Sequence, residues 1–250
     1  MKVGLIGAGN MASALARGWG APVLVTDALP ERAERLAAEL GGQALDSNEE
    51  LAEQADLVVL CHKPPQLSEV AEQVGGRAKA IASILAATRV AEIEKAYPGT
   101  PVYRFIPNLP AEVRHGVLCY TPGSLAGQGP EDEVIELFSR VGLVVPLAEP
   151  LIEPAMAVMS SGPAFFARIV EAFADAGARH GLEPQTALQL TAEAMGGTAA
   201  LLRELDAATV RERVATPGGV TERGLAVMEE RQVPEALGAV VDVVVEATKR

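Results

Sequence analysis

The sequence has few basic residues, few cysteines and few histidines, and each shortage excludes a class of function. Its 250 residues carry 21 Lys and Arg against 33 Asp and Glu, a formal net charge of −12. This balance argues against a nucleic-acid-binding protein, because phosphates need clustered basic side chains. Cys61 and Cys119 cannot build a disulfide framework, and with three scattered histidines they show no metal-ligand spacing. We expect no metal site and interpret both cysteines as small, strand-associated hydrophobic residues.

Long apolar segments are also missing. No run of about eighteen apolar residues occurs, and the amino terminus lacks the charged segment, apolar core and cleavage site of a secretory signal. These two absences predict a cytoplasmic protein that does not bind membranes.

An apolar segment at residues 3–6 runs directly into a glycine turn and the start of a helix. Gly7 permits a tight turn, and Gly9 lets the backbone approach a pyrophosphate that the helix start near Asn10 would face with free N–H groups. Ala12 takes the position where a small residue allows close packing. The alternative is a purely structural turn, since a glycine pattern alone is a weak signal. The buried-strand pattern before it and the one-sided apolar helix after it favour a dinucleotide site.

Strand-like and helix-like segments alternate through the first part of the chain, which predicts a doubly wound parallel sheet. A helix is predicted over Pro30–Leu40, because proline suits a first turn and Gly41 can end the helix. The Asp46-Ser47-Asn48 segment is expected to cap the next helix. The strands predicted after the first cover residues 22–26, 56–60, 79–85, 101–106, 117–120 and 143–147.

After about residue 148 the strand patterns stop, and Ala-, Leu- and Glu-rich segments continue to the end. We therefore expect a dinucleotide-binding domain over residues 1–150 and an all-helical domain over residues 151–250. Segments 165–178 and 185–202 are apolar over more than one face, and such helices need burial on several sides. This predicts a homodimer, or a larger homo-oligomer built from dimers, formed through the helical domain. The alternative is that these helices pack against the sheet domain.

Five motifs spread over nearly the whole chain carry a family resemblance. They are the Gly7–Met11 turn, His62-Lys63-Pro64 and the segments 104–110, 161–165 and 216–221. In this order they resemble the pyrroline-5-carboxylate reductase family. The resemblance implies a Rossmann-type domain followed by a helical dimerisation domain. It also implies hydride transfer from NADPH or NADH to the C=N bond of 1-pyrroline-5-carboxylate, which gives L-proline in the last step of proline biosynthesis.

Such a reaction needs neither a metal nor a covalent nucleophile, because a protonated imine accepts hydride when it is well positioned. The glycines before a predicted helix start would offer backbone N–H groups to the substrate carboxylate; the alternative is a plain helix cap. The resemblance places Thr221 beside the substrate nitrogen, as a hydrogen-bonding or proton-relaying group. It also places Glu204, in a predicted helical stretch, near the substrate, with a surface salt bridge as the alternative. The expected substrate-binding residues are Thr216, Gly218, Gly219, Val220 and Thr221.

On the cofactor side, Lys63 follows a strand end, where its ammonium group could approach a ribose or a phosphate; the alternative is a solvated loop lysine. Small side chains at Ala86 and Ala87 would let a nicotinamide ring lie close to the backbone. Asn108 either contacts the nicotinamide amide or closes a turn. No histidine has a triad-like partner, so none is assigned a proton-transfer role. The expected cofactor-binding residues are Gly7, Ala8, Gly9, Asn10, Met11, Asp27, Asn48, Lys63, Pro64, Ala86, Ala87 and Asn108.

Departures from the family pattern bear on the choice of cofactor. Many members carry a polar residue and an arginine after the second strand, suited to the NADPH 2′-phosphate, whereas this chain has Asp27 and Ala28. Asp27 lies 27 − 9 = 18 residues after Gly9, close to the spacing of about 20 at which an acidic side chain binds the ribose hydroxyls. We expect a preference for NADH, although Arg32 or Arg35 could reach a phosphate.

Further departures, at Thr88, Leu109, Ser160 and Phe165, bear on the substrate. They leave open a reductase of a related cyclic imine or of a small carbonyl compound. A nucleotide-binding regulator without turnover is the alternative from another class. The glycines and threonine of segment 216–221 favour an enzyme, since a regulator would not need an anion pocket.

Overall fold

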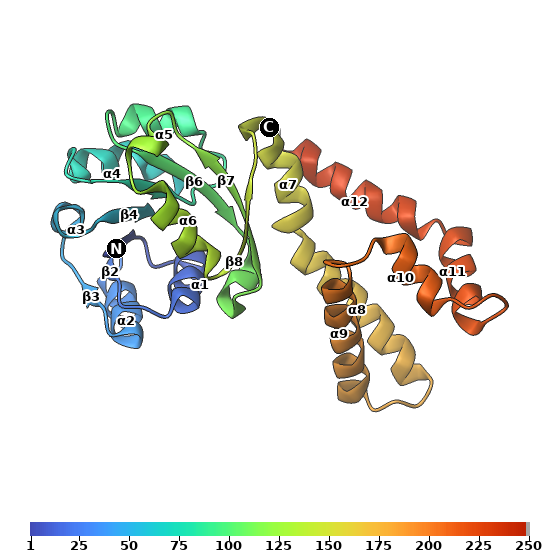
Figure 1. The fold of residues 1–250 in the computed structure, drawn as a ribbon. Coiled ribbons are helices and arrows are strands. Elements are labelled where there is room, and N and C mark those ends of the chain that lie inside the picture. The colour runs from blue at the N-terminus through green and yellow to red at the C-terminus, as the bar shows by residue number, and fades with distance from the viewer. Residues whose placement is uncertain (249–250) are drawn as a thin grey trace. The chain divides into compact units, whose positions relative to one another are not determined.

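The computed structural model describes residues 1–248, which divide into two compact units after Ser160 (Figure 1). The expected boundary was residue 150. Helix α7 (Ile152–Met159) belongs to the first unit because it packs on the sheet, where Ile152 is buried against Ile106 and Cys119.

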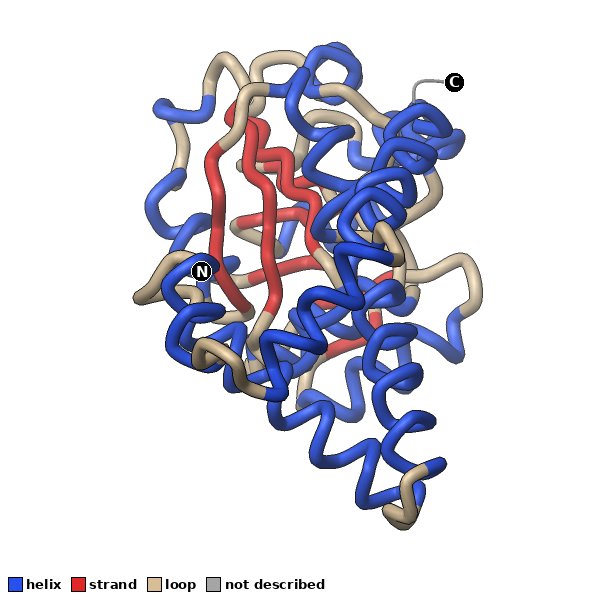
Figure 2. Tube along the Cα trace, turned by 90° about the vertical axis from the view of Figure 1, so that its right-hand side faces the viewer, coloured by secondary structure: helices blue, strands red, loops and turns tan. Residues whose placement is uncertain are grey.

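The first unit is built on one sheet, whose strands are red in Figure 2. It has eight strands in the order β3-β2-β1-β4-β5-β6-β7-β8. Neighbouring strands are parallel, as expected, except at the β6–β7 pair, which is antiparallel. Only residues 108–115 separate β6 from β7, and a parallel connection needs a crossover of about a dozen residues or more. The strands are β1 Val3–Ile6, β2 Leu24–Thr26, β3 Gln43–Ala44, β4 Leu57–Leu60, β5 Ile81–Ser83, β6 Val102–Pro107, β7 Gly116–Pro122 and β8 Gly142–Pro146.

Helices cover both faces of this sheet. One face packs against α1, α2 and α6, and there the Phe105 ring stacks on Phe138 at 3.8 Å between ring centroids. The other face packs against α3, α4 and α5, where Leu51, Val70 and Ile93 are buried. The helices are α1 Asn10–Trp19, α2 Pro30–Leu40, α3 Asn48–Gln54, α4 Leu67–Val74, α5 Val90–Ala96 and α6 Glu131–Ser139, with short 3-10 helices η1 Pro64–Gln66, η2 Leu109–Val113, η3 Ala126–Gln128 and η4 Glu149–Leu151.

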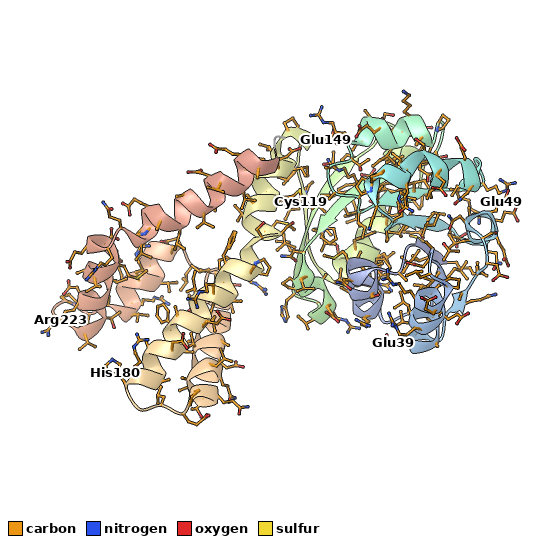
Figure 3. The ribbon with its side chains drawn as sticks, turned by 180° about the vertical axis from the view of Figure 1, so that it is seen from behind. Glu39, Glu49, Cys119, Glu149, His180 and Arg223 are labelled. Atoms are coloured by element: carbon orange, nitrogen blue, oxygen red, sulfur yellow. The ribbon has the colours of Figure 1, made fainter. Side chains whose placement is uncertain are left out.

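Local sequence signals set several helix ends as expected. Helix α2 begins at Pro30 and ends at Gly41, which takes the left-handed conformation with φ +65°. Helix α3 is capped by Ser47, whose side chain accepts a hydrogen bond from the Glu50 N–H at 3.1 Å. Both cysteines are free thiols, and Cys119 is buried within β7 (Figure 3).

The second unit, as far as residue 248, consists of helices and their connections. Many of its large apolar side chains are exposed; Phe166 and Phe173 on α8 are 53% and 61% exposed. The expectation that these helices need further burial therefore agrees with their surface. No helix among residues 1–248 is long and apolar enough to span a membrane. The helices are α8 Gly162–Arg179, α9 Pro184–Leu201, α10 Ala207–Val214, α11 Val220–Glu230 and α12 Val233–Thr248.

Candidate functional site

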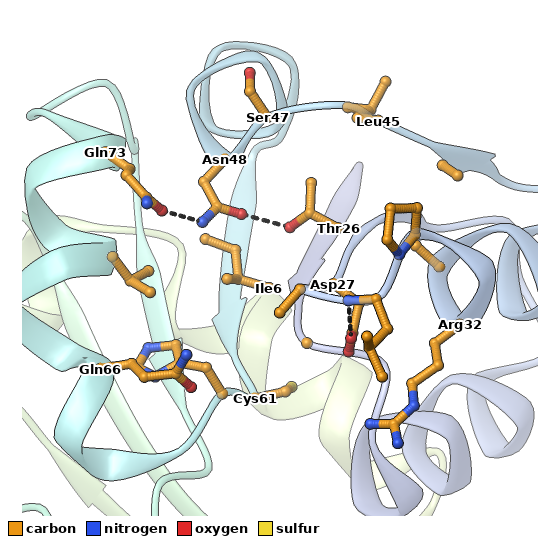
Figure 4. Close-up of a pocket in the computed structure, with 18 of the residues that line it drawn as sticks. Ile6, Thr26, Asp27, Arg32, Leu45, Ser47, Asn48, Cys61, Gln66 and Gln73 are labelled. Atoms are coloured by element: carbon orange, nitrogen blue, oxygen red, sulfur yellow. Dashed lines mark hydrogen bonds between the residues drawn. The ribbon is translucent and has the colours of Figure 1, made fainter.

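A cavity of about 810 Å³ lies at the carboxyl ends of β1, β2 and β4 (Figure 4). Strand β1 pairs with β2 on one side and with β4 on the other, so the connections diverge at this point. Open α/β sheets bind ligands at such a switch point. Five of the expected cofactor-binding residues line this cavity: Gly7, Gly9, Asp27, Asn48 and Lys63.

The two glycines of the turn have different structural roles. Gly7 has φ +108°, and a Cβ there would lie 2.7 Å from the Cys61 carbonyl oxygen, so glycine is required by both conformation and space. A Cβ at Gly9 would have no atom within 4 Å. Gly9 is the N-cap residue of α1 and offers no capping side chain to the first N–H groups. This open cradle at a helix start fits a pyrophosphate; Asn10 and Met11 are the first two residues of α1.

Asp27 holds its carboxylate at the same turn. One oxygen accepts a hydrogen bond from the Ala8 N–H at 2.7 Å, and the other accepts one from the Leu29 N–H at 2.9 Å. A carboxylate keeps further acceptor capacity after two such bonds, and this one lines the cavity where ribose hydroxyls could donate to it. The cavity wall as a whole is more acidic than basic: Asp27, Glu34, Asp46, Glu49 and Glu69 against Arg32 and Lys63.

A chain of polar side chains crosses the cavity wall (Figure 4). The Thr26 hydroxyl donates to the Asn48 side-chain oxygen at 2.5 Å, and the Asn48 amide donates to Gln73 at 2.6 Å. These bonds fix the orientation of the Asn48 amide. One of its N–H groups remains for a ligand, because an amide nitrogen has two donors.

His62 and Cys61 also line the cavity, and the surroundings favour the neutral form of both side chains. The His62 Nδ1 lies 2.9 Å from the Lys63 carbonyl oxygen, which can only accept, so this nitrogen carries the proton. Burial lowers the pKa of His62, which favours the neutral ring. Burial likewise raises the pKa of the Cys61 thiol, which keeps it protonated.

Three other expected cofactor residues, Pro64, Ala86 and Ala87, do not line the main cavity. Pro64 and Ala87 line a second cavity of about 590 Å³ near α4 and α5. Ala87, in the turn after β5, has φ +53°, a conformation that alanine rarely adopts. The neighbouring Thr88 is only 4% exposed, and its hydroxyl donates to the Ala86 carbonyl oxygen at 3.3 Å. The turn at Ala86 and Ala87 is therefore closely constrained.

The side-chain nitrogen and oxygen of Asn108 both form hydrogen bonds within the first unit. Its nitrogen donates to the Met159 carbonyl oxygen at 2.9 Å, and its oxygen accepts from the Val117 N–H at 2.8 Å. The residue is 6% exposed. Of the two interpretations of Asn108, these bonds favour the one in which it closes the connection from β6 to β7.

The expected substrate residues belong to the second unit, where they form a tight turn before α11. Gly218 has φ +75°, and its N–H donates to Glu222 at 2.7 Å. Gly219 is the N-cap residue of α11, and a Cβ there would lie 2.7 Å from the Thr216 hydroxyl oxygen. The predicted helix start is confirmed. Thr221 is exposed on its first turn.

Glu204 does not lie in a helix as expected. Helix α9 ends at Leu201, and Glu204 follows in a turn, where its N–H bonds to the Leu201 carbonyl oxygen. Its side chain is exposed and forms no ion pair within the described part of the chain. Helical composition continues to Glu204, but Asp206 caps α10 and starts a new helix, so the chain must turn before it.

Comparison with known proteins identifies the family. The family model described as "Pyrroline-5-carboxylate reductase dimerisation" matches residues 149–250. A second family model, described as "NADP oxidoreductase coenzyme F420-dependent", matches residues 2–87. A pyrroline-5-carboxylate reductase of Pseudomonas aeruginosa is 34% identical, covering 95% of this chain and 93% of its own length. The chain belongs to the pyrroline-5-carboxylate reductase family.

Other members of this family are similar to this chain over nearly all of its length. A Synechocystis pyrroline-5-carboxylate reductase is 31% identical over 92% of this chain and 90% of its own. The structure of the Coxiella burnetii pyrroline-5-carboxylate reductase matches with a TM-score of 0.89 and 27% identity, over 99% of this chain and 97% of that one. The resemblance, the succession of a Rossmann-like sheet and a helical dimerisation domain, and the assignment as an NAD(P)H-dependent oxidoreductase are confirmed.

Several cavity residues were not expected in the site, above all Thr26, Gln66 and Gln73. Thr26 is a polar residue at the end of a buried strand, and that position could have indicated it. Gln73 lies among other polar residues on the exposed side of α4, so nothing in the sequence distinguishes it.

Substitution of the two turn glycines by alanine should separate folding from cofactor binding. Gly9→Ala should melt like the wild type but bind NADH at least about tenfold more weakly, because its methyl group would fill the open cradle. Gly7→Ala should lower the free energy of unfolding by about 1–3 kcal/mol, because alanine is strained at this positive φ and its methyl group would collide with the Cys61 carbonyl oxygen. Thermal unfolding and NADH titration measure both effects. Unchanged NADH affinity in Gly9→Ala would contradict this role of the cradle.

Proposed function

We propose that this protein reduces 1-pyrroline-5-carboxylate to L-proline with a nicotinamide cofactor bound at the glycine turn. The observation that carries the proposal is the open cradle at Gly9, which lies at the switch point of the sheet in a chain of this family. The cofactor would supply the hydride, and the protein would supply position and electrostatics.

On the cofactor side, each proposed role follows from local geometry. The free N–H groups at the start of α1 would hold the pyrophosphate, and Asp27 would accept from the ribose hydroxyls. Asn48, held by Thr26 and Gln73, would donate its remaining N–H to the adenosine half. The turn at Ala86 and Ala87 would form a wall for the nicotinamide ring.

On the substrate side, the start of α11 would bind the carboxylate. The Gly218 N–H is already bonded to Glu222 and the Gly219 N–H to the Thr216 carbonyl oxygen. The N–H groups of Val220, Thr221 and Glu222, in the first turn of α11, would therefore serve the anion. The Thr221 hydroxyl would hydrogen-bond the ring nitrogen or relay a proton to it. Glu204 is the second candidate near the substrate, as the family resemblance implies.

Turnover tests this proposal directly. The protein is mixed with pyrroline-5-carboxylate and NADH or NADPH, and loss of reduced cofactor is followed together with proline formation. Thr221→Ala should lower kcat by about 10²-fold, the range of a lost general-acid contact, with NADH affinity unchanged. Thr186→Ala, which removes another exposed helix-start hydroxyl in the second unit, should leave kcat unchanged.

Three outcomes would overturn parts of the proposal. Turnover only with a six-membered imine would indicate a related substrate. Tight NADH binding without turnover of any imine would indicate a nucleotide-binding regulator. A Thr221→Ala rate equal to the wild type would remove that residue from the mechanism.

We also propose that NADH is the preferred cofactor. The acidic wall of the cavity would repel the 2′-phosphate of NADPH. That phosphate would also replace the ribose hydroxyl that donates a hydrogen bond to Asp27 in the NADH complex. Arg32 lines the same cavity, and its guanidinium has no ion-pair partner within residues 1–248, so it is the group that could oppose this preference.

The ratio of kcat/KM with NADH to kcat/KM with NADPH measures this preference. Asp27→Ser should shift the ratio at least about tenfold toward NADPH, and Arg32→Ala should weaken NADPH use alone. A wild type that prefers NADPH would refute the proposal, whatever the variants do.

The oligomer is proposed to be a homodimer, or a larger assembly of dimers, formed through the second unit. Exposed apolar side chains on α8, α9 and α12 and the match of residues 149–250 to a dimerisation model support it. Light scattering should give a multiple of twice the 26.0 kDa chain mass. Phe173→Glu should lower that mass, because it would place a charge in the interface. A monomeric wild type at micromolar concentration would contradict the proposal.

A further inference from the structure

We propose that Arg104 and Glu149 are a positioning pair that fixes the turn of residues 86–88, the wall assigned above to the nicotinamide. The inference rests on the proposed function, because that function gives the turn its role. Glu149 lies at the start of η4, after the last strand of the sheet (Figure 3). It reaches two groups that are distant in sequence, on β6 and at the start of α5.

A single oxygen of Glu149 makes both contacts. It accepts from the Arg104 guanidinium at 2.9 Å and from the Val90 N–H at 2.7 Å. Val90 is the first residue of α5, whose first N–H groups need partners outside the helix. Arg104, which is buried, supplies a cation beside this carboxylate, whose side chain is 29% exposed.

Stability alone does not explain an arginine at this position. Arg104 lies in the middle of β6 and is 2% exposed, and its Nε has no hydrogen-bond partner among the described residues. By strand alternation it shares a sheet face with Val102 and Ile106, which belong to two apolar clusters. An apolar side chain at such a site often gives equal or greater stability than a buried ion pair. We explain the positive charge of Arg104 by the turn that its partner Glu149 binds.

What Glu149 holds is one end of a strained turn. The turn begins after β5, where the Leu85 N–H donates to the Ser83 hydroxyl at 3.3 Å, and it ends where α5 starts at Val90. Between them Ala87 has φ +53°. A non-glycine residue keeps such a conformation only when its surroundings impose it. The bond from Val90 to Glu149 joins the end of this turn to η4, and the same Glu149 oxygen binds Arg104 on β6.

The pair should therefore influence hydride transfer rather than cofactor affinity. The adenosine half would bind in the cavity at β1, β2 and β4, which Arg104, Glu149 and Val90 do not line. A displaced turn would move the nicotinamide relative to the imine. Small displacements of reacting groups lower the rate steeply while binding at a separate site continues.

Four variants test the pair. Glu149→Ala removes both contacts and should lower kcat at least about tenfold with NADH affinity within twofold of wild type. Arg104→Met should also lower kcat, because it leaves the Glu149 carboxylate without its cation. The double variant Arg104→Met with Glu149→Gln should recover kcat, since the glutamine oxygen still accepts from Val90 and no charge is buried. Glu94→Ala is the control: Glu94 ties α5 to the Ser124 N–H and hydroxyl, so its loss perturbs the same helix away from the turn.

The outcomes are distinct. A wild-type kcat in Glu149→Ala, an unrecovered double variant, or an equal loss of kcat in Glu94→Ala would each overturn the positioning role. Amide hydrogen exchange over residues 86–90 provides a readout independent of turnover, and it should be faster in Glu149→Ala than in Glu94→Ala. If the wild type reduces no imine, the proposed function fails. Faster exchange of residues 86–90 in Glu149→Ala would then still support the role of Glu149 in fixing the turn, and unchanged exchange would refute that role as well.

Discussion

The site depends on one carboxylate bridging two backbone segments. Asp27, at the end of β2, accepts from the N–H of Ala8 in the glycine turn and from the N–H of Leu29 before α2. These bonds hold together the first turn and the second strand, and they place a carboxylate close to the starts of α1 and α2. The same carboxylate therefore shapes the glycine turn and contributes negative charge to the cavity wall, so a substitution of Asp27 changes both together.

Local signals in the sequence predicted the elements that depend on local chemistry. Pro30 and Gly41 set the ends of α2, Ser47 capped α3, and the glycines before Val220 marked the start of α11. The tight turn at Gly7 was predicted correctly, because a positive φ favours glycine. The space around Gly9 is open, as its predicted role beside a pyrophosphate requires. Motif order then supplied the family, which none of these local signals contains.

Features that depend on distant contacts were not predictable. The direction of β7 follows from the length of a connection, while its apolar pattern is the same in either direction. Gln73 reaches Asn48 across the cavity from an otherwise ordinary polar helix. Arg104 sits in a motif noted only for its resemblance, and its burial beside Glu149, 45 residues away, is visible only in the fold.

The reversal at β7 also decides where the chain leaves the first unit. Because β8 is parallel to β7, it ends level with the middle of β6 rather than at the carboxyl end of β6. Helix α7 then travels back along the face it covers, until the Met159 carbonyl oxygen meets Asn108 just past the end of β6. The chain therefore leaves the first unit at the carboxyl end of β6, on the same edge of the sheet as the main cavity. If β7 were parallel to β6, β8 would end at that edge of the sheet. Helix α7 would then not run back over Ile106 and Cys119, which it shields from water.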